Sequence, residues 1–301
     1  MTDPRIGRMV ADRYQLETVL GQGGMGIVYG GTHTWTERPV AVKILRSQYS
    51  VGDSLKRFFR EARTAAGLRH PNVVDVLDMG EDDDGSAFIV LERLEGESLE
   101  ERLEREKSLD AAAALRIVLP LIEALSLAHL KGIIHRDIKP ANIFLAEGHR
   151  GFEVPKLLDF GVAKLVEGAT DLRTVTGSVV GTPGYASPEQ LLGTRDLMPA
   201  ADVWGMGVVL YRMLSGRLPH EPEPNLPAWV FKIVGQPAPE LSTVAPDLPK
   251  ALTQAIMQTL VIDVDTRIAN MPILLQTLLS AAETDNIDVL DPRASAPPGS
   301  F

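Results

Sequence analysis

The sequence predicts an α+β fold in two lobes, a small mostly-β N-terminal lobe with one helix and a larger mostly-α C-terminal lobe. Short β-branched or alternating segments, broken by glycine or proline, fill the stretch from Tyr14 to about Leu91. Helical periodicity dominates after Gly96. The length of 301 residues suits one large domain or two lobes, and 45% hydrophobic with 23% charged residues is ordinary for a globular chain.

The N-terminal lobe is expected to be a sheet that follows a polar lead-in at residues 1–13. Segments with strand character occur in the order Tyr14–Leu20, Gly26–Thr32, Val40–Leu45, Val73–Met79 and Ala87–Leu91. One helix is expected at Ser54–Leu68, where apolar residues recur at helical spacing until Pro71 ends the pattern.

The second lobe is expected to be built from helices. They are predicted at Leu99–Glu106, Asp110–Lys131, Ala201–Leu214, Leu248–Leu260 and Met271–Glu283. Asp110 is the expected N-cap and Gly132 the expected C-cap of the long helix. The joint between the lobes is expected near Leu94–Gly96, and the acidic, then Ala/Ser/Pro-rich residues 282–301 are typical of a disordered tail.

Composition narrows the class of protein. A formal net charge of −10 makes nucleic acid or an anionic membrane a poor main partner. Because the chain has no cysteine, a disulfide framework, a thiol nucleophile and a Cys-based zinc site are all excluded. Residues 1–5 lack the apolar run of a signal peptide, and the apolar stretch Ile117–Leu130 is too short to span a bilayer and contains Glu123. We therefore expect a cytoplasmic protein.

The most informative motif is His-Arg-Asp-Ile-Lys-Pro-Ala-Asn at residues 135–142, followed by Asp-Phe-Gly at 159–161. It supplies a candidate base in Asp137, a cation in Lys139 and two oxygen ligands for magnesium in Asn142 and Asp159. Phosphoryl transfer requires such a set, because a hydroxyl must be oriented and the charge of a phosphate must be neutralised. Mg²⁺ prefers hard oxygen ligands and keeps several waters, which suits one amide oxygen and one carboxylate.

A glycine-rich loop, Gly21-Gln-Gly23-Gly24-Met-Gly26, lies between the first two predicted strands. Glycine lets backbone N–H groups approach phosphate oxygens without interference from a Cβ. A dinucleotide-binding turn would require a helix after the last glycine, whereas a strand is expected here. A glycine-rich hairpin without a ligand is the plain alternative.

Lys43 lies in the apolar strand Ala-Val-Lys-Ile-Leu at residues 41–45. A buried ammonium group is costly unless it is paired with a carboxylate. Glu61, on the predicted helix at 54–68, is the best-placed partner. The alternative is a lysine on an edge strand that points to solvent.

Together these motifs resemble those of eukaryotic-like (Hanks-type) serine/threonine protein kinases of the bacterial type, over residues 14–281. The resemblance implies lobes at 14–94 and 95–281, protein substrates, and ATP with Mg²⁺ as cofactors, for which Mn²⁺ can substitute. It implies that Asp137 accepts the substrate hydroxyl proton, that Lys139 neutralises the γ-phosphate, and that Lys43, positioned by Glu61, holds the α- and β-phosphates. The implied nucleotide-binding residues are Leu20, Gly21, Gly23, Gly24, Gly26, Val28, Ala41, Lys43, Leu91, Glu92, Leu94 and Leu145.

The resemblance also bears on acceptor and regulation. Lys139 and Thr182 are similar to the residues of the serine/threonine branch, with dual specificity left open. Arg136 can pair with a phosphate on the segment between residues 159 and 189. The distances of Thr174 and Thr176 from Thr182 resemble those of autophosphorylation sites, so these two are the expected phosphosites. A merely flexible, polar loop is the alternative.

Other motif residues are expected to be structural. Glu189, in Ser-Pro-Glu, is expected to form a buried ion pair with Arg267, and Asp202 is expected to brace the backbone of the catalytic loop. His135 is expected to be a packed structural residue and not a general base. Ser187 stands where alanine is usual, and no functional meaning is attached to it.

We expect an ATP-dependent kinase that phosphorylates protein serine and threonine hydroxyls and its own activation segment. Two other classes are weighed against it. A pseudokinase scaffold would be free to lose Lys43, Glu61, Asp137, Asn142 or Asp159, yet all five are present. A small-molecule phosphotransferase of related fold would not need the complete 159–189 segment. Homodimerisation occurs in such families, and the sequence names neither substrates nor an activating signal.

Overall fold

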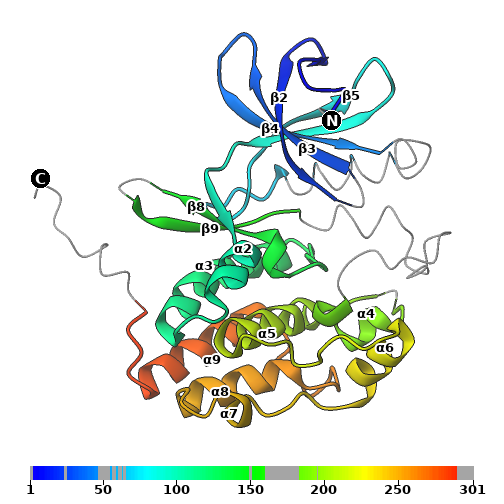
Figure 1. Cartoon of the computed structure of the whole chain (residues 1–301). Coiled ribbons are helices and arrows are strands. Elements are labelled where there is room, and N and C mark those ends of the chain that lie inside the picture. The colour runs from blue at the N-terminus through cyan, green and yellow to red at the C-terminus, as the bar shows by residue number, and fades with distance from the viewer. Residues whose placement is uncertain are drawn as a thin grey trace, which may run out of the picture. The chain divides into compact units, whose positions relative to one another are not determined.

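The computed structural model describes residues 3–23, 26–46, 55, 59, 63, 66–148, 151–159, 183–194 and 196–289. The described residues belong to two compact units, one within 1–95 and 159–171, the other within 96–158 and 172–301. The first unit is built mainly from strands and the second mainly from helices (Figure 1). This confirms the predicted α+β fold with a mostly-β and a mostly-α part.

The first unit contains a six-stranded antiparallel sheet with the order β1-β2-β3-β4-β6-β5. Its strands are β1 (Met9–Val10), β2 (Tyr14–Gln22), β3 (Gly26–His33), β4 (Pro39–Leu45), β5 (Val76–Glu81) and β6 (Ala87–Glu92). One hydrophobic cluster centres on Leu16, Tyr29, Val42 and Phe88, each at most 1% exposed. A second cluster of Leu45, Ala87 and Ile89 packs with Leu55 and Phe59, two of the described residues of the predicted helix at 54–68.

Several strand ends in this unit differ from the prediction by one or two residues, and two segments differ more. The strand expected from Val73 begins at Val76, because residues 70–73 form a turn closed by the Val73 N–H donating to the His70 carbonyl at 3.0 Å. Residues 3–13, expected as a polar lead-in, pack onto the sheet. β1 pairs with β2, the Gly7 N–H donates to the Leu16 carbonyl at 2.8 Å, and Val10 is buried in the core.

The second unit combines a three-stranded sheet, in the order β7-β8-β9, with a set of helices. Its strands are β7 (Gly96–Ser98), β8 (Ile143–Glu147) and β9 (Glu153–Leu157). Its helices are α2 (Leu99–Glu106), α3 (Ala111–Leu130), α4 (Pro188–Leu191), α5 (Ala200–Ser215), α6 (Leu226–Gly235), α7 (Leu241–Val244), α8 (Lys250–Met257) and α9 (Met271–Thr284). Short 3₁₀ turns lie at Pro140–Asn142 (η2), Pro183–Tyr185 (η4) and Gln258–Leu260 (η5). Almost every residue of α5 is buried, and this helix packs against α3, α8 and α9 (Figure 1).

Helix α3 differs from the sequence expectation in two ways. Its N-cap is Asp110 as predicted, but its C-cap is Lys131, and Gly132 follows in the left-handed region with φ +73°. Its length and composition also meet those of a membrane-spanning helix, although no such segment was expected. Half of the most apolar 18-residue stretch of this helix is buried in the structure, and α3 packs against α5 and α9. A mostly buried core helix passes the same test of length and composition.

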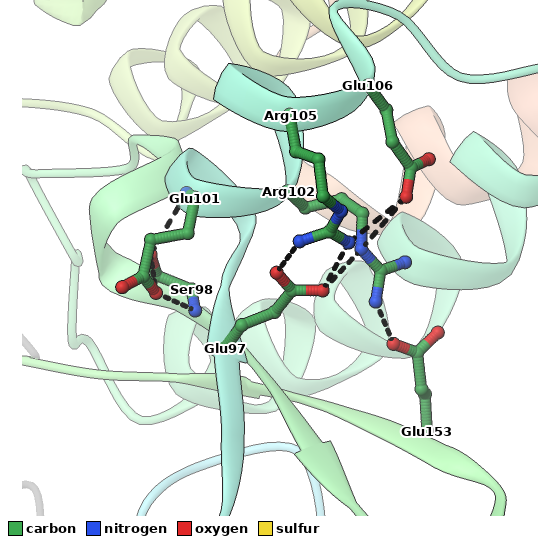
Figure 2. Close-up of polar contacts among 7 residues, drawn as sticks. All are labelled: Glu97, Ser98, Glu101, Arg102, Arg105, Glu106 and Glu153. Atoms are coloured by element: carbon green, nitrogen blue, oxygen red, sulfur yellow. Dashed lines mark hydrogen bonds and ion pairs between the residues drawn. The ribbon is translucent and has the colours of Figure 1, made fainter.

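An ion-pair network ties the short strand β7 to α2 and β9, as Figure 2 shows. The Glu97 carboxylate accepts hydrogen bonds from Arg105 and from Arg102 Nε, the latter at 2.6 Å. Arg102 Nη2 also reaches Glu153 Oε1 on β9 at 2.5 Å. The bonds from Arg105 and Arg102 lower the pKa of Glu97 to about 2. The Arg102 guanidinium on α2 thus links this helix to both edge strands of the sheet, β7 and β9.

Candidate active site

The glycine-rich loop joins β2 and β3, so a strand and not a helix follows its last glycine. This excludes the dinucleotide-binding turn. A Cβ on Gly26 would collide with the Ile44 carbonyl of β4, so packing requires glycine at this position. Within the described part of the chain, and apart from their own chain neighbours, no heavy atom lies within 4 Å of the place that a Cβ would take on Gly21 or Gly23. Gly24 lies outside the described residues.

Sheet register places three predicted nucleotide-binding residues on one face of the first unit. Val28 on β3 is directly opposite Lys43 on β4, and Ala41 lies two residues before Lys43. Because side chains alternate along a strand, all three project from the same face. Ala41 in turn pairs with Leu91 on β6.

The remaining predicted nucleotide-binding residues in the first unit differ in exposure. Leu20 is 45% exposed on β2, whereas Leu91, Glu92 and Leu94 are partly buried. In the second unit, Leu145 is 1% exposed on β8.

Lys43 is 9% exposed, and its Nζ lies 2.5 Å from Asp159 Oδ1 in the same unit. A buried lysine was expected to need a carboxylate, and the described partner is the aspartate of the Asp-Phe-Gly motif. This pairing was not predicted from the sequence, because 116 residues separate Lys43 from Asp159. The expected partner, Glu61, lies outside the described residues. Asp159 has φ +48°, a conformation that a non-glycine residue rarely adopts. The Lys43 ammonium and the carboxylate that the motif predicts as a metal ligand therefore lie side by side.

The second unit carries the candidate base and its neighbours. Asp137 Oδ2 accepts hydrogen bonds from Lys139 Nζ at 2.8 Å and from Asn142 Nδ2 at 2.9 Å. Asn142 Nδ2 also donates to the Asp137 carbonyl at 2.8 Å, which fixes the orientation of the amide. Its Oδ1 therefore faces away from Asp137, and this is the atom that a magnesium ion would need. The loop brings together three of the residues that the motif predicted.

A buried carboxylate on α5 accepts hydrogen bonds from the backbone of this loop. Asp202, 1% exposed on α5, accepts from the His135 N–H at Oδ2 and from the Arg136 N–H at Oδ1, both at 2.8 Å. His129 Nε2 lies 2.8 Å from Asp202 Oδ2. His135 is fully buried, with Nε2 2.9 Å from the Leu158 carbonyl. The expected brace and the expected packed histidine are both present.

The expected ion pair of Glu189 on α4 with Arg267 is also present. The two side chains meet in a bidentate arrangement, with N–O distances of 2.8 and 3.1 Å, and the Arg267 side chain is fully buried. Burial alone would raise the pKa of Glu189, but the hydrogen bonds from Arg267 hold it below its ordinary value.

A second ion pair in this unit was not predicted. Arg212 on α5 binds both carboxylate oxygens of Glu100 and donates to the hydroxyl of Tyr185 in η4. Two capping side chains were also missed, although Ser187-Pro-Glu-Gln190 matches the capping-box pattern and was readable from the sequence. Thr174, Thr176 and Thr182 lie outside the described residues.

Comparison with known proteins assigns the class. The model of the protein kinase domain family matches residues 14–278, and the chain belongs to this family. The solved kinase domain of PknI from Mycobacterium tuberculosis is similar in fold, with a TM-score of 0.72 and 27% identity, covering 92% of this chain and 99% of that one.

Curated relatives are bacterial serine/threonine-protein kinases. Pkn3 of Myxococcus xanthus is 40% identical over 223 residues, which are 73% of this chain and 41% of the relative. PknA of Mycobacterium tuberculosis is 38% identical over 263 residues, covering 86% and 58%. PrkC of Bacillus subtilis is 36% identical over 254 residues, covering 84% and 38%. The chain thus spans about half the length of the curated relatives it matches.

Proposed function

We propose that the chain is an ATP-dependent serine/threonine protein kinase, which transfers the γ-phosphoryl group of ATP to serine and threonine hydroxyls of proteins. The observation that carries the proposal is the loop in which Asp137 is bonded to Lys139 and Asn142 and held on Asp202. Membership of the protein kinase family and the bacterial serine/threonine kinases among its relatives support it.

Each residue of the loop has a part in the proposed reaction. Asp137 orients the acceptor hydroxyl and takes its proton as the bond to phosphorus forms and the bond to the ADP oxygen breaks. Lys139, 2.8 Å from Asp137, places a positive charge where the γ-phosphoryl group is transferred. Because the transition state is loose, positioning and charge neutralisation matter more than the strength of the base.

The residues fit a divalent cation and the nucleotide phosphates. Asn142 and Asp159 are the residues that would hold Mg²⁺, which neutralises phosphate charge when it is bound, and Mn²⁺ accepts the same oxygen ligands. The donor set of one amide oxygen and one carboxylate suits such hard cations. Lys43, whose ammonium is held by Asp159, is assigned to the α- and β-phosphates.

The same proposal covers the regulation of the kinase, its partners and its location in the cell. We assign Thr174 and Thr176 as autophosphorylation sites and Arg136 as the residue that pairs with the resulting phosphate. The net charge of −10 supports protein substrates over nucleic acid or anionic membranes as partners, and a cytoplasmic signalling role is proposed with them.

The proposal is tested by phosphate transfer from labelled ATP with Mg²⁺ to a generic basic protein, beside small alcohols and aminoglycosides. We expect labelling of the protein alone. Asp137→Asn should lower transfer by at least about 100-fold while ATP binding stays close to wild type, because the loss falls on the base and not on the nucleotide contacts. Binding without transfer in the wild type would favour a pseudokinase scaffold, and labelled aminoglycoside would favour a small-molecule phosphotransferase.

A further inference from the structure

The residue before the candidate base has a strained backbone. Arg136 has φ +67°, in the left-handed region that non-glycine residues rarely adopt. Such a conformation persists only where surrounding contacts hold it, and it is often found at functional sites. Here both sides of the residue are held. Its N–H donates to Asp202 Oδ1 at 2.8 Å, and its carbonyl accepts from Gln190 Nε2 at 2.7 Å.

The Gln190 side chain bridges two backbone groups of opposite character. Its Oε1 accepts from the Ser187 N–H at 3.0 Å, and its Nε2 donates to the Arg136 carbonyl. Because one neighbour is a donor and the other an acceptor, only this orientation of the amide satisfies both. Glutamate could accept from Ser187 but could not donate to Arg136, and methionine could do neither. Residue 190 therefore needs a side chain that offers both a hydrogen-bond acceptor and a donor, as the glutamine amide does.

Gln190 is itself presented by a firmly anchored turn of helix. It is the third residue of α4, whose N-cap is Ser187, and the two form a reciprocal capping box. The preceding residue, Glu189, is bound to the fully buried Arg267. A side chain on such a rigid support can fix the geometry of a neighbouring group more closely than one on a loop. The Ser187 hydroxyl accepts from the Gln190 backbone N–H at 3.4 Å, so it caps this turn of helix without contacting the Gln190 side-chain amide.

We propose that Gln190 is a positioning residue for phosphoryl transfer, whose amide holds the Arg136 carbonyl and thereby the backbone that presents Asp137. The inference rests on the proposed kinase function. The catalytic loop is then held from two sides, by Asp202 on α5 and by Gln190 on α4. Misplacement of a reacting group by about 1 Å can cost as much as 100-fold in rate.

The test compares Gln190→Glu with Ser187→Ala in the full chain. Gln190→Glu keeps the acceptor for the Ser187 N–H, removes the donor and sets a carboxylate against the Arg136 carbonyl. We expect its kcat to fall at least about tenfold with the KM for ATP within about twofold of wild type. Ser187→Ala removes the cap hydroxyl but leaves the Gln190 amide, so it should lower Tm and keep kcat within about twofold. Equal kcat in Gln190→Glu and wild type would overturn the inference.

Two further measurements keep the outcome decisive. If Gln190→Glu does not fold, Gln190→Met, which removes the donor without adding charge, must show the same loss of kcat. Hydrogen exchange of the amides of residues 135–142 does not depend on activity, and it should be faster in the Gln190 variants and unchanged in Ser187→Ala. If wild type transfers no phosphate, the proposed function fails, whereas the exchange result still decides whether Gln190 holds the loop.

Discussion

The Glu189–Arg267 pair gives a prediction whose size follows from the structure. All five N–H groups of the buried Arg267 guanidinium are used, two on Glu189 and the others on the carbonyls of Ala200, Val261 and Ile262. Glu189→Gln keeps the shape of the side chain but leaves the guanidinium charge uncompensated. Loss of one partner of a buried pair costs roughly 3–5 kcal/mol, a large part of the roughly 5–15 kcal/mol that stabilises a typical protein.

The assay is thermal and urea unfolding of Glu189→Gln beside Glu223→Gln. The Lys232–Glu223 pair has an N–O distance of 2.7 Å, but both side chains are about one third exposed, so its loss should cost less than about 1 kcal/mol. At roughly 2–4 °C per kcal/mol, Glu189→Gln should lower Tm by roughly 6–20 °C. Equal small losses in the two variants would refute the account of a buried, uncompensated charge.

The same pair predicts a pH dependence. The pKa of Glu189 is held below its ordinary value of 4.5 in the folded protein, so the pair contributes stability that is present above about pH 4.5 and is lost as pH falls. The amide that replaces this carboxylate in Glu189→Gln cannot titrate. The difference in unfolding free energy between wild type and the variant should therefore shrink as the pH is lowered below about 4.5. A difference that is constant down to pH 3 would contradict the proposed charge pairing.

Three further predictions concern the second unit. Arg102→Met, which breaks the link between β7 and β9, should lower the free energy of unfolding in urea by about 1–2 kcal/mol. Arg105→Met, which removes a mostly exposed guanidinium, should lower it by less, and equal losses would contradict the bridging role of Arg102. The Glu97 carboxyl, followed by NMR, should titrate near pH 2, so its contribution to stability is present above about pH 4.5 and lost between there and pH 2. Gly207→Ala should lower the free energy of unfolding by about 1–3 kcal/mol, because the added Cβ would lie 2.7 Å from the Thr259 Cβ. An unchanged urea midpoint would contradict this tight packing of α5 against Thr259.

The long helices were predictable because their signals are local. Helix α2 has the predicted bounds, and α3 begins after the predicted Asp110 cap, since periodicity and capping are set by residues close in sequence. The sheet β7-β8-β9 was missed. β7 has three residues, and its pairing with β8 joins segments more than 40 residues apart, which no local pattern shows.

The features of the candidate site also fall into those that local sequence predicts and those that it does not. Motif residues such as Asp137 and Asn142 lie close in sequence, and their chemistry could be inferred from residue type and spacing. Contacts between distant segments could be inferred only where the family resemblance implied them, as for Glu189 and Arg267. The bond of Gln190 to the Arg136 carbonyl spans 54 residues and depends on how α4 packs, so the sequence alone did not reveal it.

The most direct test of the central claim is the intact mass of phosphatase-treated protein before and after incubation with ATP and Mg²⁺, for wild type and Asp137→Asn. The account predicts that wild type alone gains phosphate and that peptide mapping places it at Thr174 or Thr176. Equal phosphate gain in Asp137→Asn would contradict the assignment of Asp137. Absence of any gain in wild type, together with no labelling of a protein substrate, would contradict the assignment as an active kinase.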